Sequence, residues 1–296
     1  MDPDGTPEAL VPRAPLDPAA LPRAVRASVA AVSPRGLGRV EVVASTASTS
    51  SDLLAAASAV TGVPWPDRSV LVADHQVAGR GRAGRTWETP AGVALTFSVL
   101  LRPAVPPARL GWVPLLGGLA VVQALAAVTG VHAVLKWPND VLVEATEEMP
   151  GWGAFRKVAG VLGDLAATED GTAVVLGIGI NVAQRADELP VPSASSLALA
   201  GAVVDRTELL AAVLARWAEL DDRWRAHDGD AGAAGLGAQV AAACTTIGRA
   251  VEVDLPGGTV LAGLATGLAD DGALLVTADG RVRAVHAGDV RLRTRG

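Results

Sequence analysis

The sequence predicts a mixed α/β domain followed by a small β-domain. Half of the 296 residues are hydrophobic, which is enough for a substantial core. From residue 39 to about residue 243, apolar runs typical of strands alternate with segments typical of helices. After Thr246 the chain changes to short apolar runs separated by tight turns. We therefore expect a larger domain over residues 39–245 and a small C-terminal β-barrel over residues 246–296.

The elements of the larger domain follow from local patterns. Strands are expected over residues 40–45, 69–74, 92–101, 157–167 and 172–182, with a hairpin-like pair on either side of Pro138-Asn139-Asp140. Helices are expected over residues 53–60, 108–128, 205–227 and 231–243, the first of them capped by Ser50-Ser51-Asp52. Residues 145–155 are interpreted as an exposed hairpin extension or a mobile loop.

Residues 1–38 differ in texture from the rest. They are rich in proline, alanine and charge and lack a long periodic apolar face. They are interpreted as a mostly disordered leader with a short helix from Pro18 to Ala30. A helix-turn-helix domain needs about 50–60 residues with three apolar-faced helices, so this segment predicts no DNA binding.

Composition excludes several classes of protein. The net charge of −6 makes the chain a poor electrostatic match for DNA or an acidic membrane. A single cysteine, Cys244, excludes an internal disulfide and fits the cytoplasm. The apolar run from Leu110 to Val128 is broken by proline, glycine and glutamine, so it predicts a buried helix rather than a membrane span. The four histidines are too scattered for a metal site.

Lysine and asparagine are almost absent. Only Lys136 and Lys157 are lysines among the 25 basic residues, and only Asn139 and Asn181 are asparagines. A planar guanidinium does not replace a compact ammonium at a tight anion site. All four residues lie inside suggestive motifs, so the few that remain mark candidate functional positions.

Residues 79–86 fit two phosphate-binding patterns. Gly79, Gly81 and Gly84 satisfy the dinucleotide fingerprint, and Gly79 to Thr86 approaches a P-loop. Both patterns need a helix directly after the turn, and Pro90 with Gly92 prevents one. Both matches are therefore coincidental. The three arginines at 80, 82 and 85 and the indole of Trp87 instead suit an anionic ligand that carries an aromatic ring.

Three further segments carry chemistry. Residues 136–140 (KWPND) are a strand that ends in a polar turn, and residues 156–162 (RKVAGVL) place a lysine at the mouth of an apolar strand. In residues 177–182 (GIGINV), the glycines let a ligand approach the backbone and Asn181 offers a donor and an acceptor.

Together with residues 75–87 (HQVAGRGRAGRTW), these segments resemble the signatures of biotin–protein ligases (biotin–[acetyl-CoA carboxylase] ligases). Residues 48–54 (STSSDLL) resemble the segment that opens the family's biotin pocket, and the resemblance covers roughly residues 40–296. It implies a central mixed β-sheet flanked by helices, as in class II synthetases and biotin–lipoate ligases. The family usually has asparagine at the position of Ser50, which puts one ligand contact in question. Many relatives carry an N-terminal DNA-binding domain that residues 1–38 cannot supply, so the chain looks monofunctional.

The resemblance assigns roles to particular residues. Lys157 and Arg82 are the expected catalytic cations, bridging the biotin carboxylate and the α-phosphate, and Asp140 organises either Lys157 or Mg²⁺–phosphate. Biotin is expected to contact Ser48, Thr49, Ser50, Gln76, Gly79, Arg80, Gly81, Arg82, Lys157 and Gly160. ATP or the adenylate is expected to contact Arg82, Arg85, Trp87, Lys157 and Asn181.

The implied reaction joins biotin to ATP as biotinyl-5′-AMP and passes biotin to a lysine of a biotin carboxyl carrier domain. ATP and Mg²⁺ are the expected cofactors, and the metal keeps mostly water and phosphate ligands, so no metal-binding residue is assigned. A monomer or weak homodimer in the cytoplasm is expected, with no DNA or membrane partner. Two alternatives stay open: a lipoate or octanoate ligase or transferase of the same superfamily, and a biotin-sensing repressor.

Overall fold

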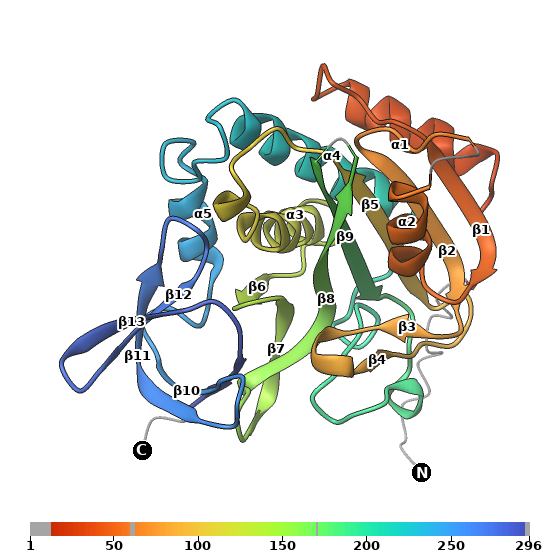
Figure 1. Cartoon of the computed structure of the whole chain (residues 1–296). Coiled ribbons are helices and arrows are strands. Elements are labelled where there is room, and N and C mark those ends of the chain that lie inside the picture. The colour runs from red at the N-terminus through yellow and green to blue at the C-terminus, as the bar shows by residue number, and fades with distance from the viewer. Residues whose placement is uncertain (1–12, 60–62, 170, 294–296) are drawn as a thin grey trace, which may run out of the picture.

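The computed structural model describes residues 13–59, 63–169 and 171–293. Its larger domain is built on a seven-stranded sheet of order β1-β2-β5-β9-β8-β7-β6 (Figure 1). The strands are β1 (Val40–Thr46), β2 (Ser69–Gln76), β5 (Ala94–Leu101), β6 (Ala133–Lys136), β7 (Asp140–Met149), β8 (Gly153–Thr168) and β9 (Gly171–Asn181). Only β1 and β2 pair in parallel. The predicted mixed sheet is confirmed.

Helices cover both faces of this sheet (Figure 1). They are α1 (Ala20–Ala30), α2 (Thr49–Ala57), α3 (Trp112–Thr129), α4 (Arg206–Arg225) and α5 (Leu236–Ala243). The helices α3 and α4 pack on one face and on each other, and α2 packs alone on the opposite face. Because β5 is central and covered on both sides, all eight of its residues are buried. This explains its mostly apolar sequence.

The apolar run predicted to be a buried helix is α3. The segment Pro107–Thr129 has the length and hydropathy of a membrane span, but most of its apolar window is buried inside the protein. Gly117 and Gly118 allow its close approach to the sheet, since a Cβ at Gly118 would lie 2.7 Å from the side chain of Leu135. The helix ends at Gly130, which adopts the left-handed conformation that glycine tolerates best.

The C-terminal β-domain is a five-stranded antiparallel sheet of order β13-β12-β11-β10-β14. Its strands are β10 (Ala250–Asp254), β11 (Val260–Leu268), β12 (Leu274–Ala278), β13 (Arg281–Val285) and β14 (Asp289–Leu292). Since β13 and β14 form its two edges, we describe it as a sheet. The indole N–H groups of Trp112 and Trp137 donate to the carbonyls of Asp270 and Gly272, which joins this domain to the larger one.

The described part of the expected leader is not disordered, so that prediction is wrong for residues 13–38. The helix α1, foreseen over Pro18–Ala30, packs on α4 and buries Leu21, Val25 and Val29 completely. Its apolar residues recur every four positions, which is typical of a helix with one buried face. Residues 1–12 lie outside the described residues.

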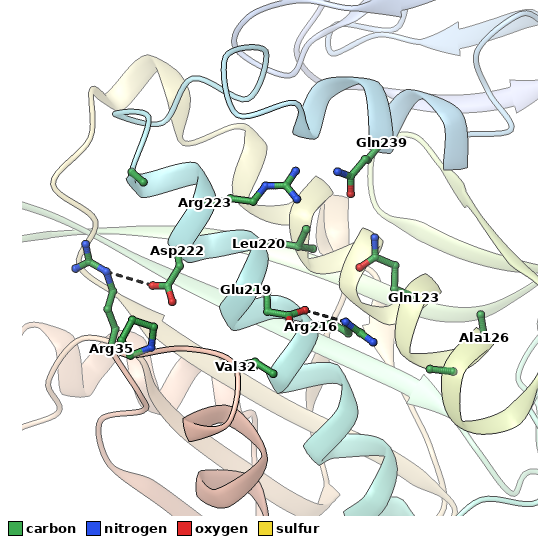
Figure 2. A pocket seen from close by; sticks show the side chains of 13 residues that line it. Val32, Arg35, Gln123, Ala126, Arg216, Glu219, Leu220, Asp222, Arg223 and Gln239 are labelled. Carbon is green, nitrogen blue, oxygen red and sulfur yellow. Dashed lines mark hydrogen bonds and ion pairs between the residues drawn. The ribbon is translucent and has the colours of Figure 1, made fainter.

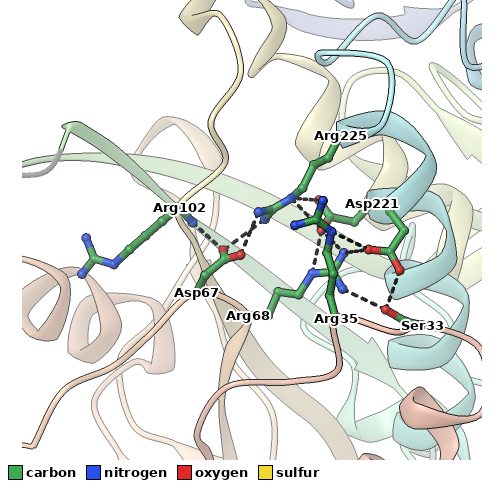
Figure 3. A network of polar contacts seen from close by, with 8 residues as sticks. Ser33, Arg35, Asp67, Arg68, Arg102, Asp221 and Arg225 are labelled. Carbon is green, nitrogen blue, oxygen red and sulfur yellow. Dashed lines mark hydrogen bonds and ion pairs between the residues drawn. The ribbon is translucent and has the colours of Figure 1, made fainter.

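A buried polar network ties the end of α1 to the sheet and to α4 (Figure 3). Arg68, only 2% exposed, donates to Asp221 at 2.5 and 2.9 Å and to Ser33 at 2.9 Å. Arg225 contacts both Asp221 and Asp67. Segments distant in sequence therefore meet through arginine forks, which suit bidentate carboxylate pairing.

Candidate active site

The described residues form two large hollows. One is an open groove of about 1140 Å³ over α3 and α4 (Figure 2). Its charged groups are satisfied locally, since Arg35 pairs with Asp222 and Arg216 with Glu219. The other is a more enclosed cavity of about 760 Å³, within the range of small-molecule sites. Its polar groups converge on the interior, so we take it as the candidate site.

The floor of this cavity is the sheet face that α2 covers. Gly160 of β8 lies directly between Asp140 of β7 and Gly179 of β9, and Gly177 lies opposite Ser98 of β5. Because paired residues share a face, these glycines form a patch without side chains where a ligand can approach the backbone. The sequence prediction for the GIGINV glycines is consistent with this geometry.

Every predicted site residue except Gly79 lines the cavity. Those residues are Ser48, Thr49, Ser50, Gln76, Arg80, Gly81, Arg82, Arg85, Trp87, Asp140, Lys157, Gly160 and Asn181. Gly79 is buried and pairs with Trp87, and a Cβ there would lie 2.4 Å from the carbonyl oxygen of Trp87. Its part is to let two strands approach closely.

The glycine–arginine segment forms a hairpin of β3 (Gly79–Arg80), a short 3₁₀ turn (Arg82–Gly84) and β4 (Thr86–Trp87). No helix of useful length follows it, as the sequence predicts for a loop that is neither a P-loop nor a dinucleotide fingerprint. Two of its three arginines form ion pairs with carboxylates of the protein. Arg80 pairs with Asp164 at 3.2 Å, and Arg85 reaches Asp289 of the C-terminal domain at 2.6 Å. Nearby carboxylates already compensate these charges.

Two lysines converge on one buried carboxylate. Lys157 Nζ lies 2.5 Å from Asp140 Oδ1, and Lys136 Nζ lies 3.5 Å from Asp140 Oδ2. Burial alone would raise the pKa of Asp140, but the two ammonium groups outweigh it and hold that pKa below its usual value. Burial lowers the pKa of Lys136, which also sits over the ring of Trp152 at 4.8 Å. The cluster has two cations for one anion, with Lys157 facing the cavity.

The indole of Trp87 lies on the glycine floor. A Cβ at Gly179 would be 2.6 Å from this ring, and a Cβ at Gly160 would be 3.1 Å from it. Lys157 Nζ lies 5.6 Å from the ring centroid. Burial lowers the pKa of Arg82, whose guanidinium contacts Asn139 at 3.4 Å. The indole of Trp87 on the floor thus lies beside the part of the cavity that Lys157 and Arg82 line.

The first turn of α2 supplies the hydroxyl end of the cavity. Ser48 caps the helix, and Thr49 and Ser50 contact the buried hydroxyl of Ser98 at 2.7 and 2.9 Å. The backbone N–H of Thr49 donates to the side chain of Gln76 at 2.8 Å. This end is polar but uncharged, unlike the cationic wall.

Asn181 is less available than the sequence suggests. Its side-chain amide donates to the carbonyl of Ser195 at 2.8 Å and accepts from Gln184 at 2.9 Å. Both ends therefore hold the loop after β9, leaving one N–H and one lone pair for a ligand.

Known proteins are similar to this chain in sequence and in fold. Residues 42–181 match the biotin/lipoate A/B protein ligase family, and residues 246–293 match the biotin protein ligase C-terminal domain. The chain is 38% identical to a biotin–[acetyl-CoA-carboxylase] ligase of Mycobacterium tuberculosis over 86% of this chain and 89% of the relative. The chain belongs to the biotin protein ligase family.

A solved member of the biotin protein ligase family has the same fold. The enzyme from Aquifex aeolicus, in complex with biotin and ATP, is 29% identical and superposes with a TM-score of 0.67 over 87% of this chain and 99% of its own. A ligase from Paracoccus denitrificans is 36% identical over 61% of this chain and 73% of the relative.

Some lining residues are not among those to which the resemblance assigns a role. They include Lys136, Asn139, Ser98, Trp152 and, from the C-terminal domain, Asp254, Asp289, Val290 and Arg291. The scarcity of lysine and asparagine already pointed to Lys136 and Asn139. Ser98 lies inside an apolar strand, and nothing in its local sequence marks it. The C-terminal residues reach the cavity only through tertiary packing.

The C-terminal arginines divide into two pairs. Arg291 contacts Asp254 at 2.6 Å and Arg293 approaches Glu252 at 3.7 Å, so neighbours on the same sheet balance them. Arg281 and Arg283 are exposed on edge strand β13. Of these four arginines, Arg281 and Arg283 leave positive charge exposed on the surface.

Proposed function

We propose that this chain is an ATP-dependent ligase that activates biotin as biotinyl-5′-AMP and transfers it to a lysine of a carrier domain. The observation that carries the proposal is the arrangement of one cavity. A polar uncharged end lies at α2, a cationic wall lies at Lys157 and Arg82, and an indole lies on a glycine floor between them. Family membership supports the same reaction.

In the first step a biotin carboxylate oxygen attacks the α-phosphorus of ATP. A new P–O bond forms, the bond to the β-phosphate oxygen breaks, and pyrophosphate leaves. The reactants are both anions, so cationic donors must neutralise them together. In this proposal Lys157 and Arg82 bridge the two anions, which is supported by their places in the lining of one cavity.

In the second step the amine of the carrier lysine attacks the acyl carbon of the mixed anhydride. The amide bond forms, the acyl–phosphate bond breaks, AMP leaves and the amine loses a proton. Water would hydrolyse the anhydride, so exclusion of water is part of the catalysis. The glycine–arginine hairpin lies beside the glycine floor and suits that covering role.

Asp140 positions Lys157 in this proposal. The ion pair with Lys157 at 2.5 Å and the contact with Lys136 engage both carboxylate oxygens. Among the residues that the structure describes, no group of three His, Cys, Asp or Glu side chains could hold a metal ion. In this proposal Mg²⁺ would accompany the ATP phosphates and neutralise them.

We further propose that the hydroxyl end takes the ureido ring and that Trp87 flanks the adenine. An acidic biotin carboxyl carrier domain in the cytoplasm is the proposed acceptor.

The polar end of the cavity disfavours the alternative of lipoate or octanoate, because the end opposite their carboxylate offers no N–H or C=O group. A biotin-sensing repressor predicts a gel shift with operator DNA, which we do not expect. A monomer or weak dimer stays a prediction.

Incubation with labelled biotin, ATP and a biotin carrier domain tests the proposal. We expect biotin-dependent release of pyrophosphate and label on the carrier, with neither product when lipoate or octanoate replaces biotin. A carrier whose acceptor lysine is replaced by arginine is the control, and it should leave only the first step. Lipoyl transfer at a rate above biotinyl transfer would contradict the assignment.

A further inference from the structure

Four polar side chains form a continuous chain at the end of the cavity. Gln76 closes β2, Thr49 and Ser50 begin α2, and Ser98 lies in the middle of β5 with no solvent exposure. Thr49 Oγ1 lies 3.0 Å from Gln76 Oε1 and 2.7 Å from Ser98 Oγ, which lies 2.9 Å from Ser50 Oγ. Ser98 is therefore the hub that connects the two hydroxyls of α2.

Gln76 determines the donor and the acceptor in every hydrogen bond that connects these four side chains. The backbone N–H of Thr49 lies 2.8 Å from Gln76 Oε1, and an N–H can only donate, so the atom facing it must be the amide oxygen. The Thr49 hydroxyl contacts the same oxygen and must donate to it as well. Because a hydroxyl carries one hydrogen, Thr49 accepts from Ser98, and Ser98 in turn accepts from Ser50.

This order leaves different groups free at the two ends. Ser50 has committed its hydrogen to Ser98, so its oxygen presents only lone pairs. Gln76 has committed its oxygen to Thr49, so its Nε2 group presents N–H donors. Both residues line the cavity. The end wall thus offers an acceptor and donors at separate positions, which is the complement of a cyclic urea with its N–H and C=O groups.

We propose that Ser98 is a positioning residue that transmits the polarity set by Gln76 to Ser50. The inference rests on the proposed function, because it takes the ureido ring as the group that binds here. It explains how serine serves at a position where the family usually has asparagine: the relay turns a hydroxyl that could donate or accept into a fixed acceptor.

The relay also gives a basis for specificity. Buried groups that are built to pair with a ligand's N–H and C=O are left unpaired when the ligand lacks them, and such sites reject those ligands strongly. A dithiolane ring or an alkyl chain supplies neither group. The same wall should accept desthiobiotin, which lacks the sulfur but keeps the cyclic urea.

Biotin binding to Ser98→Ala, measured by calorimetry, tests the relay. Removal of the hub breaks two neutral hydrogen bonds and frees Ser50 to rotate, so we expect biotin affinity to fall roughly tenfold to a hundredfold. ATP affinity should not change. Ser69→Ala is the matched control, because Ser69 is equally buried on β2, bonds to Pro66 and Arg39, and does not line the cavity.

A double-mutant comparison separates positioning from packing. Ser50→Ala should weaken biotin binding in the parent chain but much less in the Ser98→Ala background, since the relay acts through Ser50. Methylation of the ureido nitrogens should likewise weaken binding to the parent more than to Ser50→Ala. Additive losses, or parent-like biotin affinity in Ser98→Ala, would overturn the relay.

The experiments distinguish a failure of the proposed function from a failure of the relay. A parent chain that binds no biotin and releases no pyrophosphate with biotin and ATP would refute the ligase assignment. A parent chain that performs both, beside a Ser98→Ala variant with unchanged affinity, would refute only the relay.

Discussion

Two buried clusters each place two cationic side chains around an aspartate, but only one of them faces a cavity. In the network beneath α4, Arg68 and Arg225 surround Asp221, and further contacts to Asp67 and Ser33 complete it (Figure 3). In the cavity, Lys136 and Lys157 surround Asp140. The first cluster is closed by planar forks, whereas the second is left with positive charge that faces open space.

The difference teaches where this chain needs a lysine. An arginine fork makes fixed bidentate bonds and suits a pair whose partner never leaves. A compact ammonium can hold a carboxylate while it also accepts an incoming anion. In a chain with 23 arginines and two lysines, both lysines sit at the one cluster that must receive a ligand.

Lys157→Arg should give the largest effect. The guanidinium keeps the charge but not the size, and Gly160 and Trp87 crowd the ammonium site. We expect pyrophosphate release to fall by roughly 10³-fold, as when an essential transition-state donor is removed, with the melting temperature nearly unchanged. The measurement is single-turnover adenylation beside thermal unfolding. Near-normal adenylation would show that the lysine–arginine distinction does not hold at this site.

Arg68→Ala should have the opposite effect to Lys157→Arg: it should lower stability and leave biotin binding unchanged. It leaves the carboxylates of Asp221 and Asp222 with fewer partners, and breaking a buried ion pair costs about 3–5 kcal/mol. We expect a lower free energy of unfolding in urea with KM for biotin unchanged. Arg216→Ala is the control, since its pair with Glu219 is exposed and should contribute under about 1 kcal/mol. Equal losses for the two variants would remove the contrast between buried and exposed arginines.

Much of this comparison could be predicted from the sequence, and part could not. The motifs around Lys157, Asp140 and the arginine hairpin are contiguous, and residue scarcity singled out Lys136. The Arg68 network joins residues near positions 33, 67 and 221, and no local pattern connects them. The same holds for Ser98 and for α1, whose burial depends on a helix that lies nearly two hundred residues further along the chain.

A third ion pair, between Arg13 and Glu188, uses an arginine fork as the first cluster does and is connected to a lysine of the second cluster. Arg13 donates to both oxygens of Glu188 at 2.8 Å. Glu188 belongs to the loop whose Ser193 and Ser195 hold the backbone of Lys157. The Arg13 hydrogen bonds are the main reason that the pKa of Glu188 falls to about 2. Arg13, which lies in the expected leader, is thus connected to Lys157 through one loop.

Glu188→Gln should show a pH-dependent effect. Because the folded pKa lies below the usual value near 4.5, the Glu188 carboxylate stabilises the fold above about pH 4.5, and this contribution is lost as the pH falls towards about 2. The parent should therefore exceed the variant in stability at neutral pH and converge with it near pH 2. Urea unfolding across that range measures this, with Glu219→Gln as the control. A constant difference between parent and variant would contradict the assignment.

Asp289→Asn should give the smallest change in stability and the most local one. Arg85 and Asp289 are both about half exposed, and such pairs contribute about 0–1 kcal/mol. They nevertheless join the hairpin to β14 across the cavity mouth. We expect an unchanged melting temperature but faster amide exchange over residues 79–87 without ligand, because one of the two carboxylates holding the hairpin is removed. Biotinyl-AMP should restore the protection, since its phosphate replaces the lost anion. Exchange rates that match the parent in both states would mean that the backbone pairing of β3 and β4 holds the hairpin without help from the C-terminal domain.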